Sequence, residues 1–288
     1  MSPDSGGQWD AWLGRTVTQT DRLDPALARR WLGTFDLGAL PGDVMPQGIH
    51  FCLCTPEAPQ AALGEDGHPM RDNSAASFFP PIPLPRRMWA ASDIAFLGPL
   101  KLGAQIERIS RIASISEKDG ASGKLGFVEA EHVTLADGAE AVRETQTLVY
   151  RDKVPRDAPL TPPEPGEGRF VPSDWDVHRA LVPDPRLLFR FSALTFNTHR
   201  IHYDLPYAHD VERYRGLVVH GPLMASLLLQ MAARELGENT LRRFAFRAVS
   251  PAIADEPLHL AMRKAEHGFE LGSFASDGRR VVTATANT

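Results

Sequence analysis

Apolar and polar residues alternate along several stretches of the chain, which is the pattern of half-buried β-strands. Breaks that contain Gly-Pro, Asp-Gly or Ala-Asp-Gly separate these stretches, so neighbouring strands are expected to be antiparallel and joined by turns. The strands predicted in the first half are residues 87–96, 105–117, 125–135 and 142–150. The strands predicted in the second half are residues 187–194, 241–249, 258–266, 269–275 and 280–286.

Three other apolar stretches predict helices. Residues 25–35 follow Asp24, a residue type that caps helix N-termini, and residues 46–55 form a shorter candidate. Residues 222–236, PLMASLLLQMAAREL, are apolar on nearly every side, so this helix is expected to be buried. Each half therefore offers a helix followed by antiparallel strands, which predicts an α+β fold. A sheet wrapped around the helix would bury it, and two such sheets can pair edge to edge.

Prolines and charged residues interrupt the chain between its two halves. Residues 151–168 hold five prolines, and no regular element fits this composition. We therefore predict an N-terminal domain of residues 1–150, a Pro-rich linker of residues 151–168 and a C-terminal domain of residues 169–288. Residues 57–85 are expected to form a long loop, and loops of that length are often functional.

The composition is that of a globular protein, with 43% apolar and 23% charged residues. The net charge of −5 argues against nucleic acid as a partner, because such binding needs a basic surface. No apolar run approaches the roughly 20 residues that span a bilayer, and the N-terminal segment lacks the basic start and apolar core of a signal peptide. Cys52 and Cys54 are too close in sequence for a good disulfide and too few for a zinc site. We therefore expect a cytoplasmic protein with two thiols and no membrane partner.

Candidate chemistry is concentrated in residues 192–204, SALTFNTHRIHYD. This segment gathers an amide, two imidazoles and a guanidinium, which belong to Asn197, His199, His202 and Arg200. A His220-Gly221 pair follows, directly before the apolar helix. A neutral imidazole can transfer protons at pH 7, and unpaired amides at a helix N-terminus stabilise negative charge. The two segments together suit a reaction that moves a proton while an oxygen gains charge.

The segment resembles the motif of the MaoC-like family of R-specific enoyl-CoA hydratases and dehydratases. The family pattern is an aspartate, any residue, Asn or His, Pro, an aliphatic residue and His. In this frame His202 matches the catalytic histidine and His199 the Asn/His position, whereas Asn197 replaces the aspartate and Arg200 the proline. Residues 219–221 match the turn whose glycine amide binds the thioester oxygen.

The resemblance extends to the first half of the chain. Residues 83–90, PLPRRMWA, are similar to the first domain of the two-domain branch, which includes hydratases of mesaconyl-C4-CoA and of itaconyl-CoA. The branch implies a double hot-dog fold with a degenerate N-terminal domain and a C-terminal domain that carries the motif. It also implies an acyl-CoA substrate, no cofactor and assembly into a homodimer.

The resemblance implies a role for each matched residue. His202 would transfer the proton, Asn197 would orient water, and the amide of Gly221 would stabilise the enolate oxygen. Substrate-binding roles are expected for a further set of polar residues: His199, Arg200, His220, Arg86 and Arg87.

Structural alternatives stay open for several of these side chains. His199 and His220 can serve only to hold their loops, Arg200 can pair with Asp204, and the two arginines after the Pro-rich loop can belong to a solvated turn. A zinc site on His199 and His202 would need Asp204 or His220 as a third ligand. Pro206 and the neighbouring aromatic residues indicate a loop rather than a helix that would align these ligands, so no metal is expected.

The expected function is that of a hydro-lyase, which adds or removes water across the α,β double bond of a short acyl-CoA. The branch favours a C5 dicarboxyl thioester, either mesaconyl-C4-CoA or itaconyl-CoA. A 3-hydroxyacyl-ACP or 3-hydroxyacyl-CoA dehydratase of fatty-acid type is the alternative enzyme. A non-catalytic thioester-binding module is the alternative outside enzymes, because an amide at position 197 cannot act as a base.

Overall fold

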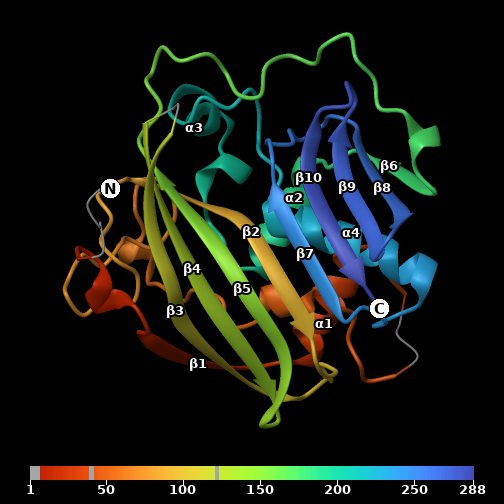
Figure 1. Ribbon diagram of the computed structural model, residues 1–288, viewed down its shortest axis with the longest axis horizontal. Helices are drawn as coiled ribbons and strands as arrows, with labels where there is room; N and C mark the ends of the chain where they lie inside the picture. Colours follow the sequence, from red (N-terminus) through yellow and green to blue (C-terminus); the bar gives the residue numbers. More distant parts are fainter. Residues whose placement is uncertain (1–6, 39–41, 121–122) are drawn as a thin grey trace.

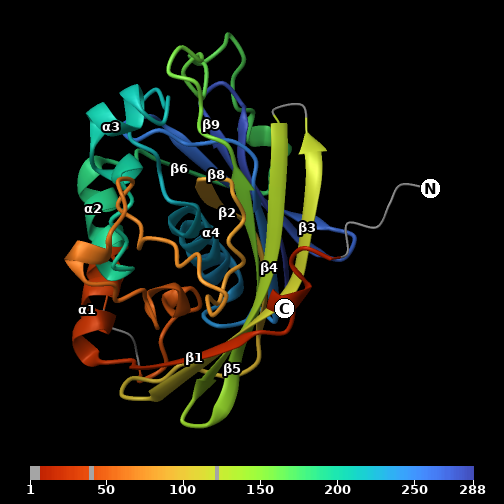
Figure 2. The same cartoon turned by 90° about the vertical axis from the view of Figure 1, so that its left-hand side faces the viewer.

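One curved antiparallel sheet runs through the whole molecule (Figures 1 and 2). The computed structural model describes residues 7–38, 42–120 and 123–288, so the first six residues of the segment assessed for a signal peptide lie outside the described part. Among the described residues ten strands pair in the order β1-β3-β4-β5-β2-β7-β10-β9-β8-β6. Their bounds are β1 Thr16–Arg22, β2 Arg86–Phe96, β3 Gln105–Gly120, β4 Gly123–Ala136, β5 Ala139–Arg151, β6 Val177–Leu181, β7 Arg243–Ala248, β8 Leu258–Ala265, β9 Gly268–Ala275 and β10 Arg280–Asn287.

The two halves of the chain join through β2 and β7. These strands pair from Ala91↔Arg247 to Ala95↔Arg243, so the first-half sheet continues into the second-half sheet. The edge-to-edge pairing predicted from the sequence is therefore confirmed. The division into domains at residues 150 and 169 stays a prediction, although residues 152–171 contain no helix or strand.

Eight of the predicted strands are confirmed to within a few residues, but the sequence did not predict the two edge strands. β1 and β6 are short, and few of their side chains are buried. Edge strands of this kind carry polar residues on both faces, so the alternation that identifies a half-buried strand is missing.

The strand predicted at residues 187–194 is wrong, because this segment is the helix α2 Pro185–Leu194. Asp184 caps the helix by accepting a hydrogen bond from the amide of Leu187, and Pro185 occupies its first turn. Leu188, Phe191 and Leu194 recur at the spacing of one helical face and are buried. The cap and the spacing therefore outweigh the β-like composition.

Two further helices frame the core. The predicted first helix is confirmed as α1 Pro25–Thr34, with the carboxylate of Asp24 accepting from two backbone amides. α1 packs against α2, where the rings of Phe35 and Phe191 lie 6.3 Å apart. The buried apolar helix is confirmed as α4 Gly221–Leu236, around which the sheet curves (Figure 2).

The helix predicted at residues 46–55 is reduced to one 3-10 turn, η2 Ile49–Cys52. Gly48 before the turn and Cys54 after it have positive φ, and Pro46 lacks an amide hydrogen, so a longer helix cannot form. A Cβ on Gly48 would lie 3.3 Å from Leu229 of α4, which shows how closely this turn approaches the central helix.

The two cysteines are free and buried, as the sequence predicts. Burial raises the pKa of the Cys52 thiol to about 12, so this thiol stays protonated at neutral pH. Within the described residues no helix is long and apolar enough to cross a membrane.

Candidate active site

The histidine motif lies between α2 and α4, in a turn that α2 and the short helices η5 Arg200–His202 and α3 Leu205–Asp210 position. Phe196 adopts a positive φ of 48° and reverses the chain after α2. The side-chain oxygen of Asn197 then accepts a hydrogen bond from the amide of His199 at 2.9 Å. Asn197 therefore holds the turn through one lone pair of its oxygen, and its amide nitrogen and the second lone pair are left for a water or a substrate.

His202 is a buried imidazole with a defined tautomer. The residue is only 7% exposed, and its Nδ1 lies 2.7 Å from the carbonyl oxygen of Val218. Because a carbonyl oxygen only accepts hydrogen bonds, Nδ1 carries the hydrogen and Nε2 carries the lone pair. Burial lowers the pKa of His202 to about 4, although the bond to Val218 opposes this shift. The imidazole is therefore neutral at pH 7, as a general base must be.

His202 lies beside the start of α4. Its ring stacks on the ring of His220 with centroids 3.5 Å apart, and His220 immediately precedes Gly221, the first residue of the helix. Nε2 of His220 lies 2.8 Å from the hydroxyl of Ser192. In the described part of the chain no acceptor takes the Gly221 amide hydrogen, and a Cβ added there would meet no atom within 4 Å beyond the neighbouring residues and the backbone of α4. An unpaired amide and a neutral imidazole thus occupy one site.

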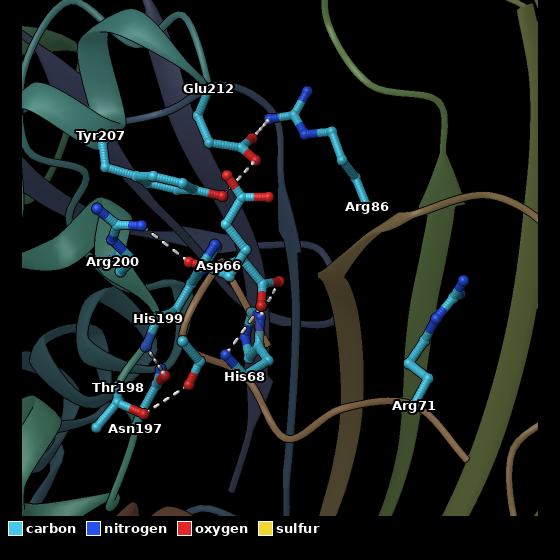
Figure 3. A network of polar contacts seen from close by, with 12 residues as sticks. Asp66, His68, Arg71, Arg86, Asn197, Thr198, His199, Arg200, Tyr207 and Glu212 are labelled. Atoms are coloured by element: carbon cyan, nitrogen blue, oxygen red, sulfur yellow. Dashed lines mark hydrogen bonds and ion pairs between the residues drawn. The ribbon is translucent and has the colours of Figure 1, made fainter. Parts of the chain in front are cut away.

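The structure adds two residues that the sequence did not predict. Asp66 and His68 come from the long loop of the first half, and the carboxylate accepts hydrogen bonds from Nδ1 of His68 at 2.9 Å and from its amide at 3.0 Å. The ring of His68 lies 4.1 Å from that of His199 (Figure 3). The ring of His199 in turn lies 5.5 Å from that of His202. The one sequence signal for them was the length of their loop.

Backbone contacts join this loop to the motif. The hydroxyl of Thr198 donates to the carbonyl of Gly67 at 2.6 Å, and the amide of Arg200 donates to the carbonyl of Asp66 at 2.8 Å. Gly67 has a φ of +86°, and a Cβ there would lie 1.9 Å from the carbonyl oxygen of Thr198. Only glycine allows the two segments to approach this closely.

Replacing Gly67 by alanine is expected to displace the loop from the motif. Gly103→Ala is the matched control, because Gly103 has a φ of +84° but no atom within 4 Å of an added Cβ. Both variants pay the left-handed backbone cost of about 1–2 kcal/mol, and Gly67→Ala adds the clash. The unfolding temperature and the turnover number should therefore both fall further in Gly67→Ala than in Gly103→Ala. Equal effects in the two variants would contradict the close approach.

Two arginines near the motif are each paired with a carboxylate. Arg200 donates twice to the carboxylate of Asp204, at 2.9 and 2.7 Å, so the pairing considered from the sequence is present and Asp204 does not orient His202. Arg86 pairs with Glu212 at 2.5 Å and donates to the hydroxyl of Tyr214.

Two further arginines carry no such carboxylate partner in the described part of the chain. The guanidinium of Arg87 lies 5.5 Å from the ring centroid of Phe79. Arg71 donates to the carbonyls of Ile82 and Leu84 and lies 5.7 Å from the ring of Tyr150. Figure 3 shows the Arg71 guanidinium apart from the carboxylates of Asp66 and Glu212.

The geometry does not assemble the zinc site considered from the sequence. Asp204 is bound to Arg200, Nε2 of His220 faces Ser192, and the rings of His199 and His202 are perpendicular. Asp66, His68 and His199 do place one nitrogen or oxygen each within 4.8 Å of one another. Because Nδ1 of His68 already donates to Asp66, we describe these two residues as a hydrogen-bonded pair.

Comparison with known proteins shows what the chain is similar to. The family model for hydroxyacyl-thioester dehydratase type 2 matches residues 48–254. The chain is 40% identical over 284 residues to the mesaconyl-C(4)-CoA hydratase of Chloroflexus aurantiacus, covering 98% of each protein. It is 26% identical over 244 residues to the mitochondrial hydroxyacyl-thioester dehydratase type 2 of Schizosaccharomyces pombe, covering 75% of this chain and 76% of that protein.

Solved structures show the fold. HtdX of Mycobacterium tuberculosis has a TM-score of 0.66 at 18% identity and covers 95% of this chain and 99% of its own. A second M. tuberculosis protein, described as a double hotdog fold, has a TM-score of 0.58 at 13% identity, with 95% of each chain covered. The expected α+β double hot-dog fold is therefore confirmed.

Proposed function

The chain belongs to the hydroxyacyl-thioester dehydratase type 2 family, and from this premise we infer that it is an acyl-CoA hydro-lyase. The enzyme adds water to, or removes it from, the α,β double bond of a short acyl-CoA. Within this class we propose a C5 dicarboxyl thioester of the mesaconyl-C4-CoA type as the substrate. The observation that carries this choice is the 40% identity to a mesaconyl-C4-CoA hydratase over 98% of both proteins.

The site suits this chemistry through two groups. The free amide of Gly221 at the start of α4 would hold the thioester oxygen, where the helix dipole favours the negative charge of the enolate. The lone pair on Nε2 of His202 would accept a proton from the water that attacks Cβ. Asn197 would donate from its amide nitrogen to that water, while its oxygen accepts from the amide of His199 and holds the turn.

The remaining candidate residues have different prospects as binding groups. His199 contacts both His68 and His202 and would line the acyl site, while His220 would support His202 by stacking. Arg200 and Arg86 already carry carboxylate partners, so a CoA phosphate or a substrate carboxylate would have to compete with Asp204 or Glu212. Arg87 remains a candidate for a CoA phosphate.

Arg71 would bind the free carboxylate of the proposed C5 substrate. Replacing it by glutamine keeps a donor for the carbonyls of Ile82 and Leu84 but removes the charge. A charge-assisted hydrogen bond contributes about 1.5–3 kcal/mol, so KM for mesaconyl-C4-CoA should rise roughly 10–100-fold. Crotonyl-CoA has no carboxylate and provides the internal control. An equal change in KM for both substrates would assign Arg71 to the CoA portion or to the loop instead.

The alternative enzyme is a 3-hydroxyacyl-thioester dehydratase of fatty-acid type, which the 26% identity to the S. pombe protein favours. The alternative outside enzymes is a thioester-binding module without activity, in which Asn197 marks a lost function. The retained pair of His202 and the free Gly221 amide argues against a lost function.

One assay separates these functions. The absorbance of the enoyl-thioester band is followed with purified protein and mesaconyl-C4-CoA, itaconyl-CoA, crotonyl-CoA or a long-chain enoyl-CoA. Turnover of a C5 substrate with the highest kcat/KM is expected. Preference for the long chain would favour the fatty-acid dehydratase, and binding of all four without turnover would favour the module.

We further propose that the enzyme works in the cytoplasm as a homodimer. Two free, buried thiols fit a reducing compartment. Light scattering on the purified protein should give twice the mass of one chain, and a mass of one chain would contradict the dimer.

A further inference from the structure

The motif contains one histidine placed for proton transfer, whereas hydration moves two protons. Hydration takes one proton from water and delivers one to Cα, and a single histidine must do both if no other group lies close. The position that holds an aspartate in the family pattern holds Asn197 here, and its amide cannot exchange a proton in this way. A second proton-transferring group must therefore come from outside the motif, or His202 acts alone.

The long loop of the first half brings such a group to the motif. Asp66 binds Nδ1 of His68 at 2.9 Å, and because an ionised carboxylate only accepts, Nδ1 carries the hydrogen. Nε2 of His68 is then the atom free to exchange a proton. Asp66 also fixes the backbone of the loop, since its carbonyl accepts from the amide of Arg200 at 2.8 Å.

The placement of His68 fits a partner of His202. Figure 3 shows His68 beside His199, and their ring centroids lie 4.1 Å apart. The ring of His202 lies 5.5 Å from that of His199, so the two imidazoles are separated by one ring. Groups that serve the neighbouring atoms Cα and Cβ must lie this close to each other. His68 is partly exposed, with a side-chain exposure of 25%, so a substrate can reach it.

The two histidines also differ in their charged surroundings, because the Asp66 carboxylate is bound to His68 and not to His202. The groups that face the pair are Asp66 on the loop, His199 in the motif and His220, which stacks on His202, with Arg86 of β2 acting on His199. Burial alone would raise the pKa of Asp66, but the hydrogen bonds and charge of His68 outweigh it and lower that pKa. Burial, reinforced by His68 and His202, lowers the pKa of His199. His199 is therefore a neutral spacer, and the Asp66 carboxylate can stabilise an imidazolium at position 68.

We propose that His68 is the second proton-transferring residue of the hydro-lyase site and that Asp66 is its positioning residue. The inference rests on the proposed function. In the hydration direction Nε2 of His202 takes the proton of the water whose oxygen bonds to Cβ. The double-bond electrons move to the thioester oxygen held by Gly221, and Nε2–H of imidazolium 68 then protonates Cα. A proton returns from His202 to His68 between turnovers, so the cycle is balanced without any other reactant.

The test compares His68→Gln with His178→Gln as a matched control. His178 lies on β6, hydrogen-bonded to His259 at 2.9 Å and away from the motif. His68→Gln is expected to lower kcat about 10²-fold, the lower end of what an acid–base group contributes, while His178→Gln retains wild-type kcat. His68→Gln should also lose the alkaline limb of the pH profile, which a purely structural role would leave in place.

Asp66 is tested by conservative replacement and rescue. Asp66→Asn should lower kcat with little change in KM, and Asp66→Glu should retain more activity because it keeps the carboxylate. Introducing Asn197→Asp into His68→Gln should raise kcat again by restoring a carboxylate at the family position. A higher kcat in the double variant, with a pH dependence typical of a carboxylate, supports the proposal. A kcat no higher than that of His68→Gln alone counts against it.

Two results would overturn the inference while leaving the proposed function intact. The first is an active wild type whose kcat and pH profile are unchanged in His68→Gln. The second is loss of wild-type activity on treatment with a chelator and recovery with Zn²⁺, which would assign Asp66, His68 and His199 to a metal. A wild type inactive on every thioester would instead refute the proposed function itself.

Discussion

Replacing His202 by glutamine is expected to lower kcat for hydration by about 10²–10⁴-fold, the contribution typical of a general base. Glutamine retains a donor for the carbonyl of Val218, which His202 now binds at 2.7 Å, but has no basic nitrogen. The variant should therefore keep its fold and lose its turnover. The measurement is the decay of the enoyl-thioester band under saturating substrate.

His209→Gln is the matched control for the His202 variant. His209 lies on α3, a few residues from the motif, and its partly exposed side chain pairs with Asp210. It should retain wild-type kcat. Full activity in His202→Gln with a normal unfolding curve would show that another group takes the proton from water.

As pH falls, the folded protein should lose stability before His202 becomes protonated in the folded state. The pKa of His202 is lowered by burial to about 4, below its ordinary value of 6.5, so the unfolded chain binds this proton more readily than the folded protein. Burial lowers the pKa of His220 in the same way. The stability of the folded protein is therefore greatest above about pH 6.5 and falls as pH drops from there toward about 4. Rates in this window need to be compared with a circular dichroism signal recorded at the same pH.

The sequence predicted those features whose determinants lie close together along the chain. Alternation identified the strands paired across β2 and β7, and the apolar run of α4 identified the central helix. The motif around His202 and the turn that contains Gly221 were both identified from the sequence. The fold brings them together, because His202 stacks on His220, the residue before Gly221. Local periodicity and motif frames carry this information without any tertiary contact.

Features that depend on long-range contacts escaped the sequence. Asp66 and His68 approach the motif from a loop more than a hundred residues earlier, and no local pattern marks that approach. The edge strands β1 and β6 carry too few buried residues to alternate. The strand predicted in place of α2 was wrong for a different reason. Asp184 and Pro185 are a typical helix start, but the apolar composition of residues 187–194 was given more weight.

Replacing Gly221 by proline is expected to lower kcat by about 10²–10³-fold, because it removes the amide hydrogen proposed to bind the enolate oxygen. Proline has the φ of a first helical residue, and the amide of Gly221 has no acceptor in the described part of the chain. Pro222 disfavours a helical ψ for any residue with a Cβ before it, in Gly221→Pro and in Gly221→Ala alike. His220 has φ −63° and ψ 139°, the conformation that a residue before proline adopts.

Gly221→Ala isolates the role of that amide. It adds a methyl group that meets no atom within 4 Å beyond the neighbouring residues and the backbone of α4, and it keeps the N–H. If the amide stabilises the enolate, Gly221→Pro loses kcat far beyond any change in Gly221→Ala, while the two variants unfold at similar temperatures. If both variants lose activity equally, the space beside Gly221 matters more than its hydrogen, and the oxyanion must be held elsewhere. The pair thus distinguishes an electrostatic role of the α4 N-terminus from a steric one, which no substitution of His202 can do.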